Sequence, residues 1–225
     1  MRHWIVGTGK SLLDTPLDLL KGEITWGLNR IHKFFDRTDW RPTYYAMVDF
    51  NQQNPKDYWK ECIRAHWETR KWLWTGFRDG DALFPDLGDG IGEVPNTTWI
   101  PRCRKHHYYM ADNVKRANGW HFPDICTAFS VIGVAMQLAV LNGADEIYLL
   151  GCDLYVPDYK ENFFDPDYTG DYRQRDRLDN QNMIQAHSVA RRSSPIPIYN
   201  ATVGGALEVH PRVNLYEVLE KEHAK

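Results

Sequence analysis

The chain has 225 residues, with 27 Lys and Arg against 30 Asp and Glu, so its formal net charge is −3. A hydrophobic content of 43% and a charged content of 25% are typical of a globular protein. They exclude intrinsic disorder, collagen and low-complexity repeats. The mild acidity argues against nucleic acid as a partner, because nucleic-acid-binding proteins usually carry a basic patch.

The cysteines and the apolar segments predict a cytoplasmic location. The four cysteines lie far apart and form no CxxC pair, which argues against a disulfide framework: Cys62, Cys103, Cys126 and Cys152. The first residues lack an apolar region long enough for a signal peptide. Residues 125–144 carry no charge, but a helix that starts after Ser130 has only about 12 residues, roughly 18 Å. That length is too short to cross a bilayer, so we expect no transmembrane segment.

The first half of the chain reads as strands with one helix between them. Strands are expected at residues 3–6, 24–28, 44–48 and 72–75, and a helix at 56–71. The helix is indicated by Trp59, Ile63 and Trp67, which recur at i, i+4 and i+8. We interpret these tryptophans, together with Trp72 and Trp74, as core or subunit contacts rather than as a surface that stacks on a ligand, which leaves a homo-oligomer open.

The middle of the chain, residues 76–124, is rich in Gly, Pro, Asp and aromatic residues, with a short strand expected at 98–100. We interpret this region as an irregular insertion or lid within a single domain that spans residues 1–225. Trp120 and the pair Tyr108 and Tyr109 are its best candidates for stacking on a bound substrate.

The last part of the chain returns to regular alternation. A helix is expected at 131–141, a strand at 146–151, a helix at 178–192, a strand at 196–199 and a helix at 213–221. The nearly continuous apolar run at 146–150 fits a strand that is covered on both faces, and Pro197 favours either an edge strand or the start of a strand. The whole pattern predicts an α/β fold with a mostly parallel sheet flanked by helices.

Polar and glycine residues follow several of the expected strands. Gly7, Thr8, Gly9, Lys10 and Ser11 follow the first strand, Asn29 the second, Asp49 the third and Asp153 the strand at 146–151. In open α/β sheets, ligands bind beyond the carboxyl ends of the strands, so we expect these residues to share one site.

Each of these residues also has a structural interpretation that stays open. The Gly7–Ser11 segment has the character of a phosphate-binding turn, yet it lacks the Walker spacing and a third glycine, and a plain strand-to-helix turn would look the same. Asn29 could cap the next segment. Asp153 could be a cap or a salt-bridge partner. Gly204 and Gly205 could close one side of the pocket or only turn the chain.

These segments resemble a known group of enzymes. Val6 to Leu12, then Leu28 and Asn29, then the segment from Ala144 to Tyr155 resemble the bacterial sialyltransferases of the Campylobacter lipooligosaccharide type. They are equally similar to the wider "DUF115" group, which includes archaeal pterin diphosphokinase-like proteins. The resemblance covers about a third of the chain, and its late motif, which ends at Tyr155, is the more specific one.

The resemblance implies a glycosyltransferase of the Rossmann-like GT-A type that uses a nucleotide-activated sugar, with a CMP-sugar as the first candidate. The Gly7–Ser11 turn would lie against the ribose and phosphate of the donor, and Asn29 would contact the phosphate and sugar. Ser130, or Thr127 nearby, would touch the nucleotide. Tyr155 and Tyr159 would bind the leaving phosphate, because phenols donate hydrogen bonds to developing charge without a metal.

The sequence departs from the family at the turn and at the catalytic base. Thr8 and Lys10 replace the asparagine and proline of the family turn, and residues 165–180 contain no histidine where the family has its catalytic one. His187 is a candidate base, although a histidine on the helix surface, or one whose hydrogen bonds are satisfied within the fold, is the alternative interpretation. Asp171 or Asp176 could accept the proton instead.

Cofactor requirements follow from the same comparison. The resembled sialyltransferases need none besides the donor, but a divalent metal is possible at the Asp-x-Asp triplets 79–81 and 165–167. The expected partners are a nucleotide-sugar and a small-molecule or glycan acceptor. Two other hypotheses remain: a diphosphokinase that uses ATP and Mg²⁺ bound by Asp49 and Asp153, and a nucleotide-binding module without catalysis.

Overall fold

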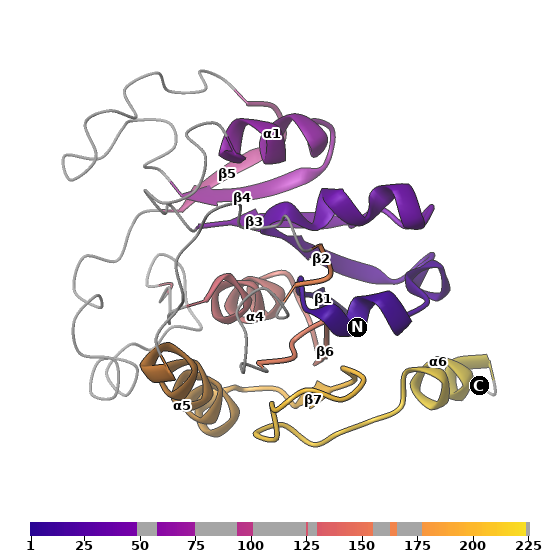
Figure 1. The fold of residues 1–225 in the computed structure, drawn as a ribbon, viewed down its shortest axis with the longest axis vertical. Helices are drawn as coiled ribbons and strands as arrows, with labels where there is room; N and C mark the ends of the chain where they lie inside the picture. The colour runs from indigo at the N-terminus through magenta and orange to yellow at the C-terminus, as the bar shows by residue number, and fades with distance from the viewer. Residues whose placement is uncertain are drawn as a thin grey trace.

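The computed structural model describes residues 1–48, 58–74, 94–100, 125, 130–154, 163–165 and 177–223. Within these residues, seven strands form one sheet in the order β5-β4-β3-β2-β1-β6-β7, and every neighbouring pair is parallel (Figure 1). The strands are β1 (Arg2–Val6), β2 (Ile24–Leu28), β3 (Tyr44–Met47), β4 (Arg70–Trp74), β5 (Thr97–Ile100), β6 (Glu146–Leu150) and β7 (Ile198–Asn200). The predicted α/β fold with a parallel sheet is confirmed.

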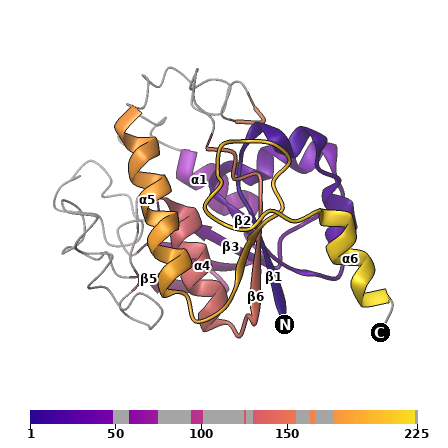
Figure 2. The same ribbon diagram turned by 90° about the horizontal axis from the view of Figure 1, so that it is seen from below.

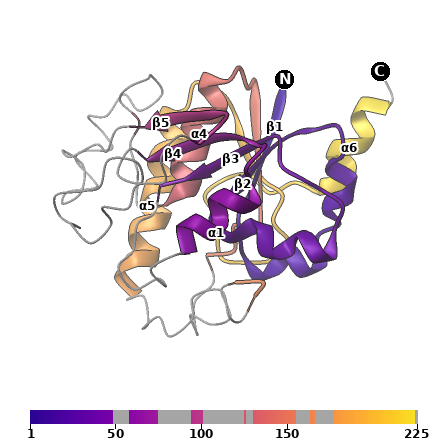
Figure 3. The ribbon, with the colours of Figure 1, turned by 90° about the horizontal axis from the view of Figure 1, so that it is seen from above.

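Helices cover both faces of this sheet. The α-helices are α1 (Tyr58–Ala65), α4 (Val131–Leu141), α5 (Arg177–Ser193) and α6 (Leu215–His223), and the 3-10 helices are η1 (Lys10–Asp14), η2 (Leu17–Leu20) and η3 (Asn29–Arg37). Figure 2 shows α4 and α5 side by side on one face and α6 on the other. In the opposite view, Figure 3, α1 lies across β2 and β3 from α4.

The two apolar layers follow from the alternation of side chains along the strands. Trp4 and Val6 of β1 face the layer beneath the 3-10 helices, α1 and α6, whereas Ile5 between them faces α4. Helix α4 is apolar all round because it packs against the sheet and lies beside α5. No helix in the described ranges has the length and apolarity needed to cross a membrane.

The helix predicted at 56–71 is shorter in the structure and ends at Ala65. Lys71 explains the end, because its buried ammonium group donates to the carbonyl oxygens of His66, Trp67 and Thr69 at 2.6–2.9 Å. These carbonyls are thereby satisfied by a side chain rather than by a further helical turn. Trp67 lies beyond the helix and is exposed.

The strand predicted at 98–100 lies inside the predicted insertion, yet it forms the edge strand β5 of the central sheet. Residues 75–93 and 101–124 of that region lie outside the described residues. The division into a domain with a lid therefore stays a prediction. Strand β7, with Pro197 just before it, is the other edge, as its proline predicts.

Candidate functional site

The strand order changes direction between β1 and β6. From β1 the chain builds the sheet outward through β2, β3, β4 and β5, and then returns to the other side of β1 with β6 and β7. In parallel sheets, ligands bind at the carboxyl ends of the two strands that flank such a reversal. The segments after β1 and β6 are the ones that the sequence singles out, so the fold brings them to one place.

The turn after β1 lies directly against the segment after β6. The amides of Gly7 and Gly9 donate to the carbonyl oxygens of Leu150 and Gly151, both at 2.8 Å. A Cβ atom at Gly7 would stand 2.5 Å from the Gly151 oxygen, and one at Gly9 would overlap the Asp153 carboxylate. Both glycines are therefore required for the approach of two backbone segments.

Asp153 fixes the end of this turn. Its Oδ2 atom accepts from the Ser11 hydroxyl at 3.0 Å and from the Ser11 amide at 3.4 Å, at the start of η1. Burial raises the pKa of Asp153, while the hydrogen bonds from Ser11 and the charge of Arg212 oppose that rise. The observed contacts of Asp153 are therefore those of a cap. The Ser11 amide donates to this carboxylate of the protein rather than to a ligand.

The chain is sharply bent around Asp153. Gly151 has φ +62° and Leu154 has φ +48°, so two left-handed residues stand close together after β6. Such a conformation is uncommon for a residue other than glycine and is found at sites that the surrounding structure holds in place.

Asn29 is a third polar residue at the carboxyl edge of the sheet, besides Ser11 and Asp153. It follows β2 in the left-handed conformation, with φ +46°, which asparagine tolerates better than most residues. The Tyr45 hydroxyl donates to its carbonyl oxygen at 2.7 Å, and the Tyr45 ring stacks on buried His66. The position of the half-buried Asn29 is therefore set by the neighbouring strand.

A short segment packs on the outside of the β1 turn. Phe164 donates its amide to the Thr8 carbonyl at 3.2 Å, and its buried ring meets Phe34 edge-to-face. Lys33 binds Asp165 at 2.6 Å, so the one described carboxylate of the 165–167 triplet holds an ion pair. Lys10 is exposed beside this segment.

Ser130 begins α4 as predicted. Its hydroxyl accepts from the Ile132 amide at 3.0 Å, which confirms that it is the N-cap. In a parallel sheet, the helix that precedes the next strand begins at the carboxyl edge. Ser130 therefore lies at the same edge of the sheet as Asn29 and Ser11.

His187 occupies a different environment. It is buried inside α5, and its Nδ1 atom lies 3.0 Å from Nε2 of His210. Burial and the charge of His210 lower the pKa of His187 to about 3. These contacts match the interpretation of His187 as a buried, hydrogen-bonded histidine, and no described contact joins it to the β1 turn.

Several predicted site residues lie outside the described residues: Asp49, Thr127, Tyr155, Tyr159, Asp171 and Asp176. Among the described ranges, no group of three or more His, Cys, Asp or Glu side chains could hold a metal ion. The roles assigned to all of these residues stay predictions.

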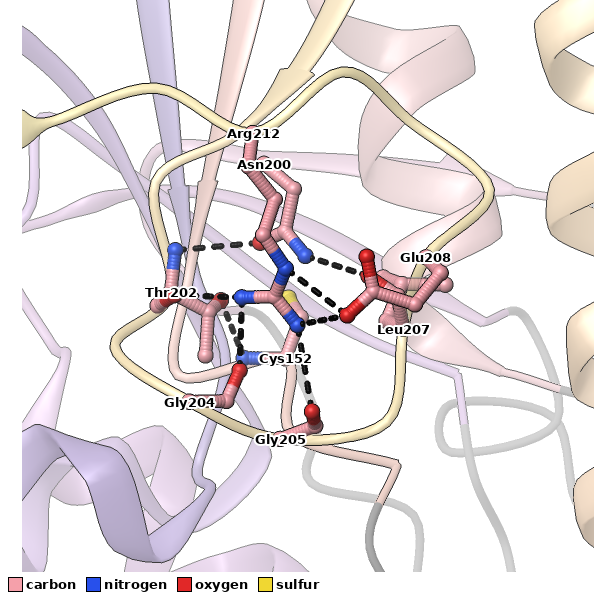
Figure 4. Close-up of polar contacts among 8 residues, drawn as sticks. All are labelled: Cys152, Asn200, Thr202, Gly204, Gly205, Leu207, Glu208 and Arg212. Carbon is pink, nitrogen blue, oxygen red and sulfur yellow. Dashed lines mark hydrogen bonds and ion pairs between the residues drawn. The ribbon is translucent and has the colours of Figure 1, made fainter.

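The structure adds a loop that the motifs do not reveal. We call residues 201–212 the β7 loop; it follows β7 and contacts Asp153, with Arg212 at its centre (Figure 4). The pair Gly204 and Gly205 is its only sequence signal. Nothing near Arg212 in the sequence shows that its partners are backbone carbonyls several residues earlier.

Comparison with known proteins supports the fold. No family model matches the chain, and no curated protein matches its sequence. Among solved structures, the MAf glycosyltransferase from Magnetospirillum magneticum AMB-1 is similar over 94% of this chain, with a TM-score of 0.56 and 13% identity. The match spans 33% of the length of that protein. The chain thus has the fold of a region of a solved glycosyltransferase.

Proposed function

We propose that this protein is a glycosyltransferase that transfers a sugar from a nucleotide-activated donor, with a CMP-sugar as the first candidate and a glycan or small molecule as acceptor. One observation carries the proposal. The described residues of two resembling motifs, Gly7–Ser11 and Leu150–Asp153, meet at the strand reversal of a sheet with the fold of a glycosyltransferase structure.

The chemistry of the edge suits hydroxyl groups of a nucleotide-sugar. Asn29 follows the strand next to the glycine turn, where Rossmann-like proteins place the side chain that binds a ribose hydroxyl. The Asp153 carboxylate would repel a phosphate but accepts hydrogen bonds from hydroxyls. We therefore assign Asn29 and Asp153 to the ribose or sugar, and the exposed Lys10 ammonium to the phosphate.

The chemical step requires groups at the leaving phosphate and at the acceptor. We propose that the hydroxyls of Tyr155 and Tyr159 donate to the departing phosphate, so that no metal or other cofactor is needed. The base must reach the acceptor hydroxyl. His187 is buried against His210, so we propose Asp176 as the base.

Nucleotide binding is the first test. We expect CMP to raise the melting temperature more than UDP, GDP or ATP, because a ligand that binds only the native state stabilises it. The measurement is a thermal-shift series followed by calorimetry. Stabilisation by none of the four would contradict the proposal, and Mg²⁺-dependent stabilisation by ATP alone would favour a diphosphokinase.

Substitution of Asn29 is the sharper test. Asn29→Gly keeps the left-handed backbone but removes the amide, and we expect CMP to bind about tenfold more weakly, roughly 1.4 kcal/mol. Asn96→Gly is the matched control, because Asn96 is also left-handed, with φ +53°, but precedes β5 at the opposite edge. Equal affinity in the two variants would remove Asn29 from the site. Tyr155→Phe should lower turnover while CMP still binds.

A further inference from the structure

The β7 loop is closed at its base. The amide of Asn200 donates to the Pro211 carbonyl at 2.8 Å, and the amide of Val213 donates back to the Asn200 carbonyl at 3.0 Å. The Asn200 side chain also donates to the Leu207 carbonyl at 2.7 Å and accepts from the Thr202 amide at 3.0 Å. The loop therefore leaves the sheet and returns to it as a compact unit.

Arg212 fills the centre of this unit (Figure 4). Its Nη1 atom donates to the carbonyls of Thr202 and Gly204 at 3.0 and 2.7 Å. Its Nη2 atom donates to the Gly205 carbonyl at 3.1 Å, and Nε and Nη2 both donate to Glu208. A guanidinium group has five N–H donors, and these five contacts use all of them. Arg212 therefore has no donor left for a ligand.

The part of the loop that Arg212 shapes is the part that touches Asp153. Gly204 and Gly205 are both left-handed, with φ +67° and +73°, and their carbonyls point at the guanidinium. A Cβ atom at Gly205 would stand 2.6 Å from the Asp153 carbonyl oxygen, and the Ala206 amide donates to that oxygen at 2.6 Å. The amide of Cys152 donates to the Thr202 hydroxyl at 3.1 Å.

Asp153 is consequently held at both of its ends. The β7 loop holds its backbone carbonyl, while its carboxylate holds Ser11 at the end of the β1 turn. We propose that Arg212 is a positioning residue of the carboxyl-edge site, which acts through the β7 loop and Asp153 to fix the turn from Gly9 to Ser11. The expected effect of Arg212 on donor binding rests on the proposed function. The placement of the turn by Arg212 is independent of that function.

The charge of Arg212 has a second effect on the same group. It opposes the rise in the pKa of Asp153 that burial causes, and so favours the carboxylate that accepts from Ser11. A neutral side chain at position 212 removes both the carbonyl contacts and this charge. A lysine keeps the charge but loses the planar fork that binds several acceptors at once.

Hydrogen–deuterium exchange tests the positioning without any nucleotide. In Arg212→Met, we expect exchange in peptides that cover residues 7–13 to become about tenfold faster, although Arg212 touches none of them. Peptides from residues 58–74, which form α1 and β4 near the β5 edge of the sheet and away from the β7 loop, are the internal reference. Unchanged exchange at 7–13, or equal acceleration in both regions, would overturn the proposal.

Two further variants complete the test. Glu208→Gln removes one charged partner of Arg212 but leaves the three carbonyl contacts, so exchange at 7–13 should stay close to that of the wild type. Arg212→Lys should return the pKa of Asp153, followed by carboxyl NMR, toward its wild-type value after the rise expected in Arg212→Met. If Arg212→Met does not fold, Arg212→Lys carries the exchange test, because it loses the planar fork and should also speed exchange at residues 7–13; unchanged exchange there would overturn the proposal. The same pKa of Asp153 in the wild type, Arg212→Met and Arg212→Lys would count against the role of the charge.

Nucleotide affinity separates this inference from the proposed function. If CMP binds the wild type, Arg212→Met should lower the affinity for CMP, because the turn that contacts it is no longer fixed. If no nucleotide binds the wild type, the proposed function fails, and the exchange experiment still decides whether Arg212 positions the turn.

Discussion

The surroundings of Gly9 exclude any side chain at this position, which its place in a glycine-rich turn does not by itself indicate. The sequence predicts a turn that lets a phosphate approach, whereas the structure shows its amide bound to Gly151 and its α-carbon against Asp153. The need for glycine was predictable from the sequence, but the group that approaches it was not. Asp153 is far away in the chain, and only the pairing of β1 with β6 brings the two together.

A substitution at Gly9 measures this constraint. We expect Gly9→Ala to lower the free energy of unfolding by about 1–3 kcal/mol, because the added methyl group meets the Asp153 carboxylate and the Gly151 carbonyl. Urea denaturation gives the value, and Lys10→Ala, at the exposed next position, should change it by less than about 0.5 kcal/mol.

Removing the carboxylate provides the control for that change. In Asp153→Ala, the cost of Gly9→Ala should be smaller, so that the two substitutions are not additive. Full additivity would mean that the Asp153 side chain is not what the methyl group meets.

At the scale of elements, most strands and helices were predictable because their patterns are local. The helix at Val131–Leu141 and the strand at Ile24–Leu28 match their predicted ranges. The 3-10 helices η1, η2 and η3 were not predicted. Helices η1 and η2 are too short to show an apolar period over several turns, and η3, which is kinked at Arg30, repeats every three residues rather than every 3.6. The end of α1 was missed because a lysine in the following strand satisfies the carbonyls of His66 and Trp67, just beyond the helix.

The contact between α5 and the β7 loop predicts a dependence of stability on pH. Burial and the charge of His210 lower the pKa of His187 to about 3, and burial and the charge of Arg191 lower the pKa of His210 to about 4. Below the ordinary value of 6.5 the unfolded chain binds protons that the native pair does not bind. The free energy of unfolding should therefore fall as the pH is lowered from about 7 to about 4.

A variant isolates the contribution of this pair from that of other buried histidines. In the double variant His187→Phe and His210→Phe, chemical denaturation between pH 7 and pH 4 should show a shallower fall in stability than in the wild type. His3 and His66, whose pKa values are also lowered by burial, remain in both proteins and serve as the common background. An identical slope would show that the pair does not carry the effect.

At the scale of the whole molecule, α6 joins the end of the described chain to its first strand. The Arg2 guanidinium donates to the Val218 carbonyl at 3.0 Å and forms a salt bridge with Glu23 at 2.5 Å, and Leu215 and Val218 are buried in the same layer as Trp4. Burial of each such side chain contributes about 1.5–3 kcal/mol.

Removal of this helix should therefore weaken the whole domain. We expect a chain that ends at residue 213 to lose roughly 3 kcal/mol or more and to melt at a lower temperature, as measured by calorimetry. Tyr216→Ala changes an exposed position of the same helix, with 54% of its surface accessible, and should leave the melting temperature nearly unchanged. Equal melting of the truncated and full chains would show that α6 is not part of the cooperative unit.

The place of β1 in the middle of the sheet bears on the order in which the protein is assembled during synthesis. Its partner β2 emerges from the ribosome soon afterwards, but its other partner, β6, follows only after β5 and α4. Until then one edge of β1 has no neighbouring strand, and such an edge invites association with other nascent chains. The contact between Gly9 and Asp153 can accordingly form only after about two thirds of the chain has been synthesised.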